Sequence, residues 1–349
     1  MADLVLVGYG SVGRTHAAVA AERRHDLFII DASPNARDRA RREYPDATIV
    51  STLSDLDGLV SAWEKIAAIV ATWAPTHHEY FHELVDRGVR RVLCEKPLAN
   101  SLANAHAMCE RADNEGVRLL AGHLFRYSTL VDDIESWASE YDLGDPVRFA
   151  STGGAVGLVN NGVHFADLAY SLFDSTPSSV VSTARSDPIN PRSDDLKYFG
   201  GTSILSFPDA REAVLSYSNR SSVGPDTRID YRDAVITIDD TFHVSIRHRS
   251  PEDLKEFPAI TRYGGASEEL YSTQNPFGDE HLYAAGHDVL FARAHEDLLG
   301  DGCPQAPGPI GLSVLHACIG SLVSAAEEES VSLPISQGSE YWQRKWAYN

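Results

Sequence analysis

The sequence predicts two domains of different class: an N-terminal α/β domain with a doubly wound parallel sheet, and a C-terminal α+β domain with a mostly antiparallel open sheet. As far as about residue 121, short apolar runs alternate with stretches of helical periodicity, which is the pattern of βαβ units. Beyond residue 146, alternating strands dominate and helices return only at the margins. A length of 349 residues accommodates two such cores.

The strands expected in the first half are short and rich in Val, Ile and Leu, and they lie at 4–7, 27–31, 47–50, 67–72, 91–94 and 117–121. The helices expected between them lie at 12–24, 34–44, 77–87 and 101–115, the last opened by the capping pair Asn100-Ser101. We place the domain boundary after residue 123, so that residues 1–123 form one domain and residues 124–349 the other.

The second half begins after the turn signal at 143–146. Its expected strands lie at 147–154, 178–185, 201–207, 211–218, 234–239 and 242–248. One helix near 163–173 interrupts them, and a long loop runs from Arg185 to Tyr198. Helical runs near 281–299 and 309–328 close the chain, and we expect one of them to pack back onto the first domain.

Charge and hydropathy exclude several classes of function. A net charge of −20 would repel a phosphate backbone, so nucleic acid is not an expected partner. No apolar run approaches the ~18 residues that span a bilayer, and the N-terminus lacks a secretory signal, so we expect a cytoplasmic protein without membrane contact. The four cysteines have no paired spacing, which argues against disulfides and against a metal site.

A glycine-rich turn, Gly8-Tyr9-Gly10-Ser11-Val12-Gly13, follows the first strand and precedes the first helix. In that context Gly8 permits a tight turn, Gly10 admits a pyrophosphate against the backbone, and Gly13 lets helix and strand pack closely. The N–H groups at the start of the helix then bind phosphate oxygens. The first domain is therefore predicted to be a dinucleotide-binding Rossmann domain.

Asp31 ends the second strand, about twenty residues beyond the glycines, where a carboxylate accepts hydrogen bonds from the adenosine ribose. A 2′-phosphate would meet Asp31 as a like charge, so NAD is the expected cofactor and NADP is disfavoured. Arg37 lies close enough in sequence to temper this preference. The alternative is that Asp31 caps the next helix, at Pro34.

Five segments along the chain form a recognisable set. They are Gly8 to His16, Thr72-Trp73-Ala74-Pro75-Thr76-His77-His78, Cys94-Glu95-Lys96-Pro97-Leu98, Gly122-His123-Leu124-Phe125-Arg126-Tyr127 and Asn160-Asn161-Gly162-Val163-His164-Phe165-Ala166-Asp167. In their order and spacing along nearly the whole chain, these segments resemble one family, the glucose–fructose oxidoreductase, inositol dehydrogenase and rhizopine-catabolism (Gfo/Idh/MocA) oxidoreductases.

This resemblance implies an NAD-dependent dehydrogenase or reductase that acts on CH–OH groups. Lys96 would lie beside the nicotinamide and exchange a proton with a substrate hydroxyl, since hydride leaves a carbinol carbon only as the hydroxyl proton is removed. The alternative is a surface lysine at a strand end, although only five of the thirty basic residues are lysines. Further cofactor contacts are implied for Thr72, Pro75, His78 and Glu95.

His164 matches the family's catalytic histidine and Asp167 its final aspartate, but Asn160 occupies the position of the first aspartate. An amide can orient the histidine without supplying charge, so we expect Lys96 to be the principal acid/base, with His164 and Asn160 beside it. The alternative for His164 is a packed helix residue, and we expect Asp167 to brace the site. The residues implied to bind substrate are Lys96, Arg126, Tyr127, Asn160, Asn161 and His164, although Arg126 could instead form an interdomain salt link.

The expected substrate is a secondary alcohol or ketone of a sugar, sugar derivative or cyclitol. One alternative is a reductase of a nucleotide-linked keto-sugar, whose more basic cleft could draw on Arg185, Arg192 and Lys197. Another is a protein of the same fold that senses a dinucleotide without catalysis. By analogy with other open sheets, we expect a homodimer or homotetramer formed through the C-terminal sheet.

Overall fold

The computed structural model describes residues 3–154, 156–187, 197–249, 254–255, 267–274 and 287–348. It divides into two compact units. The first unit comprises Met1–Ser128, Asp279–Ile319 and Ile335–Asn349, and the second comprises Thr129–Gly278 and Gly320–Pro334. Each unit therefore contains more than one stretch of chain, whereas the sequence prediction draws a single boundary after residue 123.

The first unit is built on a six-stranded parallel sheet with the strand order β3-β2-β1-β4-β5-β6. Its strands are β1 Asp3–Val7, β2 Asp26–Ile30, β3 Thr48–Val50, β4 Ala67–Val70, β5 Arg91–Cys94 and β6 Arg118–Ala121. This is the strand order of a doubly wound dinucleotide-binding fold, and the predicted fold class is confirmed. Each predicted strand lies within two residues of an observed one. The signal is clearest in β1 and β4, whose apolar runs are buried on both faces, whereas the short β3 is only partly buried.

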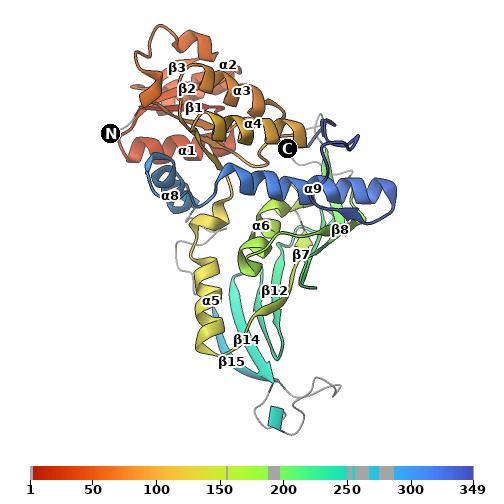
Figure 1. Ribbon diagram of the computed structural model, residues 1–349. Coiled ribbons are helices and arrows are strands. Elements are labelled where there is room, and N and C mark those ends of the chain that lie inside the picture. Colours follow the sequence, from red (N-terminus) through yellow and green to blue (C-terminus); the bar gives the residue numbers. More distant parts are fainter. Residues whose placement is uncertain are drawn as a thin grey trace. The chain divides into compact units, whose positions relative to one another are not determined.

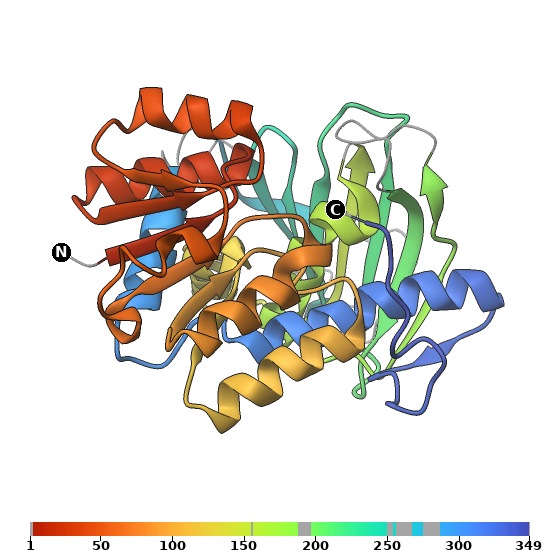
Figure 2. The same cartoon turned by 90° about the horizontal axis from the view of Figure 1, so that it is seen from above.

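Helices cover both sides of this sheet (Figure 2). Those between its strands are α1 Ser11–Glu22, α2 Pro34–Glu43, α3 Ala74–Asp86 and α4 Leu102–Asn114, labelled in Figure 1, and the shorter turns are η1 Leu53–Leu56, η2 Trp63–Lys65 and η3 Leu124–Tyr127. Ser101 caps α4 by accepting a hydrogen bond from the N–H of Asn104, as its position in the sequence predicts. The late helix α8 His287–Leu299 also belongs to the first unit and packs on α1 and β5. Of the predicted run at 281–299, residues 281–286 lie outside the described residues.

Helix α9, Gly308–Glu327, corrects one sequence-based expectation. It is long and apolar enough to cross a membrane by length and composition, although we expected no apolar run of that length. However, 67% of its most apolar window is buried inside the protein. A helix that is apolar around most of its circumference is also what a protein core requires, so burial accounts for its composition.

The second unit is an α+β domain with one mixed sheet, in the order β15-β14-β13-β12-β7-β11-β10-β8-β16 with β9 paired to β10. Every described pairing is antiparallel except that of β7 with β11, which confirms the predicted open sheet. The strands are β7 Pro146–Gly154, β8 Ser179–Ser182, β9 Arg185–Asp187, β10 Tyr198–Ser206, β11 Glu212–Ser218, β12 Asp226–Tyr231, β13 Ala234–Ile238, β14 His243–Arg249, β15 Ser267–Gln274 and β16 Val331–Ser332.

Helix α6, Gly162–Phe173, covers part of one face of that sheet by packing on β7 and β11. The sequence pattern does not predict α5 Leu130–Glu140 or the strands β12, β15 and β16. Strand β12 alternates the charged residues Asp226, Arg228 and Asp230 with more buried ones. Because half of its residues are charged, the sequence lacks the apolar content by which a strand is recognised. The predicted strand 178–185 is two strands, because β10 changes its partner from β8 to β9 at Gly201.

Candidate functional site

The glycine turn lies where the sequence places it, between β1 and α1 at the carboxyl end of the parallel sheet. A Cβ on Gly13 would lie 2.0 Å from the carbonyl oxygen of Gly8, so only glycine lets the helix start this close to the strand. Gly8 has φ +98°, and its N–H donates to the carbonyl of Ile30 at 2.8 Å, which ties the turn to β2.

Gly10 differs from the other two glycines because it faces open space. A Cβ built on it would meet no heavy atom within 4 Å. The backbone here is therefore accessible at the N-terminus of the twelve-residue helix α1, beside Ser11 and Val12. An accessible backbone at a helix N-terminus suits the approach of a diphosphate, so the turn fits the dinucleotide that the sequence predicts.

Asp31 holds the turn in place with both of its carboxylate oxygens. Oδ2 accepts from the N–H of Tyr9 at 2.7 Å, and Oδ1 accepts from the N–H of Ser33 at 2.8 Å. The residue that caps α2 is Ser33, whose Oγ accepts from the N–H of Ala36. Asp31 therefore braces the glycine turn, and a carboxylate with two oxygens retains lone pairs for ribose hydroxyls.

Tyr9 contributes its backbone to this turn and buries its side chain. The ring is 1% exposed, and its hydroxyl donates to Glu43. Burial and then the neighbouring Glu43 carboxylate raise the pKa of the Tyr9 hydroxyl. The predicted cofactor contact of Tyr9 is therefore available only through its main chain.

Thr72 and Pro75 lie after β4, at the same end of the sheet as the glycine turn. Their neighbour His77, which is not among the predicted site residues, is buried and links two loops through its ring nitrogens. Its Nδ1 lies 3.0 Å from the carbonyl oxygen of Pro97, and its Nε2 lies 3.0 Å from that of Thr72. His78 points elsewhere on α3, with its ring 4.3 Å from that of His82, as adjacent helical positions require.

Lys96 follows β5, also at the carboxyl end of the sheet. It is partly exposed, whereas Glu95 before it and Pro97 after it are buried. Buried residues therefore flank a partly exposed Lys96 at this strand end. The thiol of Cys94 is fully buried, which raises its pKa well above its ordinary value and makes it a poor nucleophile.

Behind Lys96, the Glu95 carboxylate forms a buried chain with two histidines. His16 Nε2 lies 3.1 Å from Glu95 Oε1, and His16 Nδ1 lies 2.9 Å from His295 Nε2. Burial opposes ionisation of Glu95, but the hydrogen bond from His16 and the charges of His16 and Lys96 outweigh it and hold the pKa of Glu95 below its usual value. Because its carboxylate is committed to His16, we interpret Glu95 as a residue that positions the Lys96 loop.

Acidification is expected to destabilise the first unit through His295. Burial, and then the charge of His16, hold the pKa of His295 at about 2. In the unfolded chain a histidine titrates near 6.5, so below about pH 6.5 the unfolded state binds a proton that the folded state refuses. The free energy of unfolding should therefore fall by about 1.4 kcal/mol between about pH 7.5 and about pH 5.5 through this residue alone.

Urea unfolding at the two pH values measures this drop. The drop should shrink by roughly that amount in His295→Gln, while His106→Gln, on the half-exposed surface of α4, should leave it unchanged. An undiminished drop in His295→Gln would show that another group carries the acid sensitivity.

Arg126 and Tyr127 lie in η3 of the first unit. Tyr127 is 2% exposed, and its hydroxyl donates to Asp297 Oδ2 at 2.9 Å. Asp297 also forms an ion pair with Arg118, so Tyr127 belongs to a buried polar cluster that anchors the residues after α8. Arg126 is half-buried beside it. The structure thus gives Tyr127 a structural role, in contrast to the predicted contact with substrate.

The remaining predicted residues lie in the second unit. Asn160 and Asn161 end a π-helical turn, η4 Gly157–Asn161, which leads directly into α6. Asn160 is 3% exposed, Asp167 is fully buried, and His164 is partly exposed in the first turn of α6. Gly157 has φ +70°, and a Cβ there would lie 2.8 Å from Asn160 Oδ1. Short π-helical segments are frequent at functional sites, and this one brings Asn160 and His164 onto neighbouring turns.

A family model described as an oxidoreductase family with an NAD-binding Rossmann fold matches residues 3–123. An inositol 2-dehydrogenase from Gluconacetobacter diazotrophicus is 32% identical over 146 residues, which cover 40% of this chain and 42% of that protein. Residues 3–123 therefore match the Gfo/Idh/MocA oxidoreductase family. The glycine turn and the Lys96 loop both lie within the part of the chain that the family model matches.

Sequence similarity to individual relatives covers only part of the chain, whereas similarity in fold covers nearly all of it. The chain spans less than half the length of the Gluconacetobacter protein, whereas an inositol 2-dehydrogenase from Rhizobium meliloti is 23% identical over 241 residues, covering 64% of this chain and 71% of that one. The WlbA dehydrogenase from Bordetella pertussis, solved with NADH and UDP-GlcNAcA, has a TM-score of 0.69 at 20% identity and covers 96% of this chain and 100% of its own. At that identity the likeness shows the fold.

Proposed function

We propose that this protein is an NAD-dependent dehydrogenase that transfers a hydride between the nicotinamide and a secondary alcohol or ketone of a sugar, sugar derivative or cyclitol. One observation carries the proposal. Lys96 is a partly exposed lysine at the end of β5, at the edge of the sheet where the glycine turn and Asp31 fit a dinucleotide. Ligands of doubly wound sheets bind at this edge.

In this proposal the nicotinamide supplies a hydride acceptor, and side chains of the protein manage the proton. As the C–H bond of the carbinol gives up its hydride, the amine of Lys96 takes the hydroxyl proton, which leaves a ketone and a protonated lysine. In the reverse direction Lys96 returns that proton to the carbonyl oxygen. Glu95, held by His16, fixes the start of the Lys96 loop because it also accepts from the N–H of Lys96 at 3.2 Å.

We assign substrate binding to three side chains of the second unit, His164, Asn160 and Asn161. An imidazole and two amides can donate and accept hydrogen bonds, which suits a ligand rich in hydroxyl groups. The inositol and sugar dehydrogenases among the relatives support this substrate class. Arg126 remains a proposed substrate contact because its side chain is partly accessible.

The experiment is a panel of cyclitols, aldoses and UDP-sugars, offered to the purified protein with NAD+ while the absorbance of reduced nicotinamide is followed. Turnover of a cyclitol or sugar supports the proposal. Turnover of UDP-sugars alone would favour a nucleotide-linked keto-sugar reductase, the activity for which we suggested Arg185, Arg192 and Lys197. Arg192 lies outside the described residues. Binding of NADH without turnover of any compound would favour a dinucleotide sensor.

The preference for NAD over NADP is expected to depend on Asp31. Wild-type protein should bind NADH at least about tenfold more tightly than NADPH, because a 2′-phosphate would lie beside the Asp31 carboxylate. Asp31→Asn removes the charge but keeps an acceptor for Tyr9, and should bring the two affinities within about threefold. Fluorescence titration measures both affinities.

Asp26→Asn is the matched control, because it removes the same charge from the other end of β2 and should leave the ratio of affinities unchanged. A wild-type protein that binds NADPH as tightly as NADH would contradict the assignment of Asp31 to the ribose.

Self-association through the sheet of the second unit stays a prediction. Val181 and Ile204 face each other in the register of β8 and β10, and they are 50% and 36% exposed. An exposed apolar pair on a sheet is a feature of interaction surfaces.

A further inference from the structure

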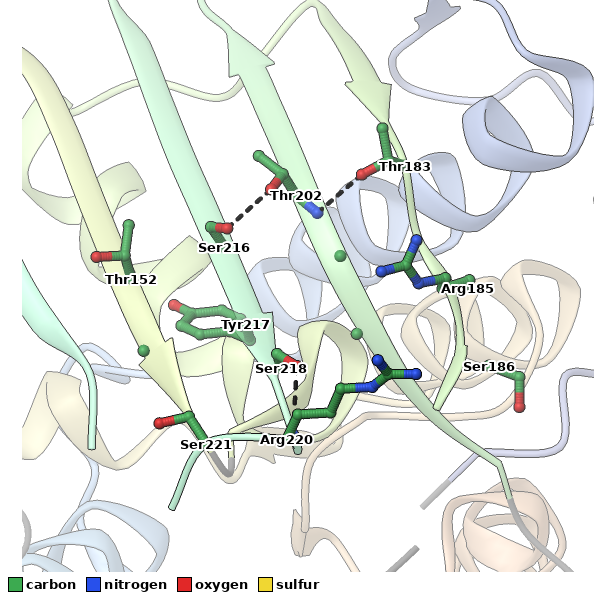
Figure 3. A pocket seen from close by; sticks show the side chains of 13 residues that line it. Thr152, Thr183, Arg185, Ser186, Thr202, Ser216, Tyr217, Ser218, Arg220 and Ser221 are labelled. Atoms are coloured by element: carbon green, nitrogen blue, oxygen red, sulfur yellow. Dashed lines mark hydrogen bonds between the residues drawn. The ribbon is translucent and has the colours of Figure 1, made fainter. Parts of the chain in front are cut away.

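The hollow shown in Figure 3 lies on the sheet of the second unit, over strands β7, β11 and β10, and has a volume of about 470 Å³. Thr202 on its floor lies on the same face of β10 as Ile204, because the two residues are two positions apart in the strand. Ile204 pairs with Val181, so the hollow belongs to the sheet face for which self-association is predicted. A feature without an assigned role lies in the first unit.

This feature is the returning segment, residues 335–348, which follows β16 and belongs to the first unit (dark blue in Figure 1). It contacts the N-terminal end of α4 through its main chain. The N–H of Trp346 donates to the carbonyl oxygen of Asn100 at 2.9 Å, and the N–H of Ala103 donates to the carbonyl oxygen of Trp342 at 3.0 Å. Because Ala103 lies in the first turn of α4, its N–H has no acceptor within the helix, and the returning segment supplies one.

The loop between β5 and α4 carries Lys96, and other parts of the first unit fix the carbonyl groups of this loop. The carbonyl oxygen of Pro97 lies 3.0 Å from His77 Nδ1 of α3. The carbonyl oxygen of Ala99 accepts a hydrogen bond from the hydroxyl of Tyr348 at 3.0 Å. The loop is thus tied to α3 one residue after Lys96 and to the returning segment three residues after it.

Tyr348 is fully buried, and so is Ala99, whose carbonyl oxygen it binds. Burial raises the pKa of the Tyr348 hydroxyl well above its ordinary value, so the hydroxyl keeps its proton and remains a donor. Loss of this hydroxyl would deprive a buried carbonyl oxygen of a donor, which is costly unless the loop shifts to find another. The Tyr348 hydroxyl therefore restrains the loop that carries Lys96.

Helix α9 packs against the same loop. A Cβ on Gly311 would lie 3.3 Å from Leu98 Cβ, and Cys318 lies two turns further along the same face of the helix. Burial raises the pKa of the Cys318 thiol to about 12, and the positive charge of Lys96 opposes that rise. The thiol in turn acts electrostatically on the hydroxyl of Tyr348. The side chains of Lys96 and Tyr348 therefore both lie close to Cys318.

We propose that Tyr348 is a positioning residue for the amine of Lys96. Its hydroxyl fixes the carbonyl group of Ala99, which fixes the loop and with it the distance between the amine and the hydroxyl group of the substrate. Tyr348 touches neither substrate nor cofactor in this proposal and acts only through the loop. The proposal rests on the proposed function, because it takes Lys96 as the group that accepts the proton. A misplacement of about 1 Å can slow a reaction by about a hundredfold, so a restraint of this kind has a measurable effect.

Tyr348→Phe tests the proposal, because it removes the hydroxyl and keeps the buried ring. On the best substrate of the panel we expect kcat to fall at least about tenfold, while KM and the affinity for NADH stay within about threefold. In the Lys96→Ala background the same substitution should lower the residual turnover less than about twofold, because the amine to be positioned is absent. Tyr341→Phe is the matched control, since it removes a hydroxyl from a half-buried tyrosine of the same segment, and it should keep kcat within about twofold of wild type.

A second measurement does not depend on turnover. Amide hydrogen exchange of the full chain is followed by mass spectrometry on peptides that contain residues 97–101. Exchange there should be at least about tenfold faster in Tyr348→Phe than in the wild-type protein, because the loop has lost a restraint, and it should be unchanged in Tyr341→Phe.

The proposal is overturned if Tyr348→Phe keeps the kcat of the wild-type protein, or if it lowers turnover as strongly in the Lys96→Ala background as in the wild-type background. Unchanged exchange of the loop in Tyr348→Phe also overturns it. Failure of the proposed function is recognised separately, because the wild-type protein would then turn over no compound of the panel. In that case the exchange measurement alone decides whether Tyr348 holds the loop.

Discussion

Replacing Lys96 by alanine is expected to lower turnover by at least about a thousandfold, with the affinity for NADH kept within about threefold. The amine is the proposed proton acceptor, while the groups that fit the dinucleotide are the glycine turn and Asp31 on β1 and β2. Steady-state kinetics on the best substrate of the panel, together with fluorescence titration of NADH, measures the two quantities separately.

Two variants make this prediction specific. Lys96→Arg keeps the positive charge but does not release a proton near neutral pH, so it should remain inactive if Lys96 transfers a proton and recover activity if Lys96 supplies charge alone. Lys65→Ala removes an exposed lysine from η2 in the same unit and should leave turnover unchanged. Wild-type turnover in Lys96→Ala would refute the assignment of the acid/base.

The second large effect is expected at the glycine turn, where two substitutions of the same size should act differently. Gly13→Ala places a methyl group 2.0 Å from the Gly8 carbonyl oxygen, so it should lower the free energy of unfolding by about 3 kcal/mol even without cofactor. Gly10→Ala meets no heavy atom within 4 Å and should unfold like wild type. Its methyl group would instead lie where a diphosphate approaches, and should weaken NADH binding at least about tenfold.

Urea unfolding without cofactor and NADH titration distinguish the two variants. If Gly10→Ala binds NADH as wild type does, the diphosphate does not approach the backbone at Gly10. If Gly13→Ala is as stable as wild type, the contact between α1 and β1 is not as close as the structure shows.

The sequence predicts most of the first unit because its signals are local. Each parallel strand is one apolar run, and each helix between them has its own periodicity and caps, such as Ser33 and Ser101. The second unit was harder to predict. Strand β15, Ser267–Gln274, has mainly exposed residues. Neither an alternating pattern nor apolar content distinguishes the sequence of such a strand from that of a loop.

The residues of the candidate site also fall into those that a local sequence signal predicts and those that it does not. Gly10, Asp31 and Lys96 belong to short motifs with a fixed position after a strand, and the sequence selects them directly. His77 and the chain from Glu95 through His16 to His295 were missed, because these groups act through contacts between distant segments. His16 and His295 are 279 residues apart, a separation at which periodicity and spacing carry no information.

Tyr127 illustrates a further limit of motifs. It lies within a segment that resembles the family pattern, yet its hydroxyl is committed to Asp297, a residue of the late part of the chain. The motif identifies the segment correctly, but which of its side chains are accessible depends on what folds back over it. Tyr127 is buried and hydrogen-bonded to Asp297 of α8, a helix that lies far along the chain from the motif.

The central claim is that this protein moves a hydride from a carbinol carbon to NAD+. The most direct test offers the substrate identified by the panel with deuterium on the reacting carbon, and analyses the reduced nicotinamide by mass spectrometry. The account predicts one deuterium per reduced nicotinamide with wild-type protein and none above background with Lys96→Ala. Tight binding of NAD+ together with no deuterium transfer from any cyclitol or sugar would contradict it.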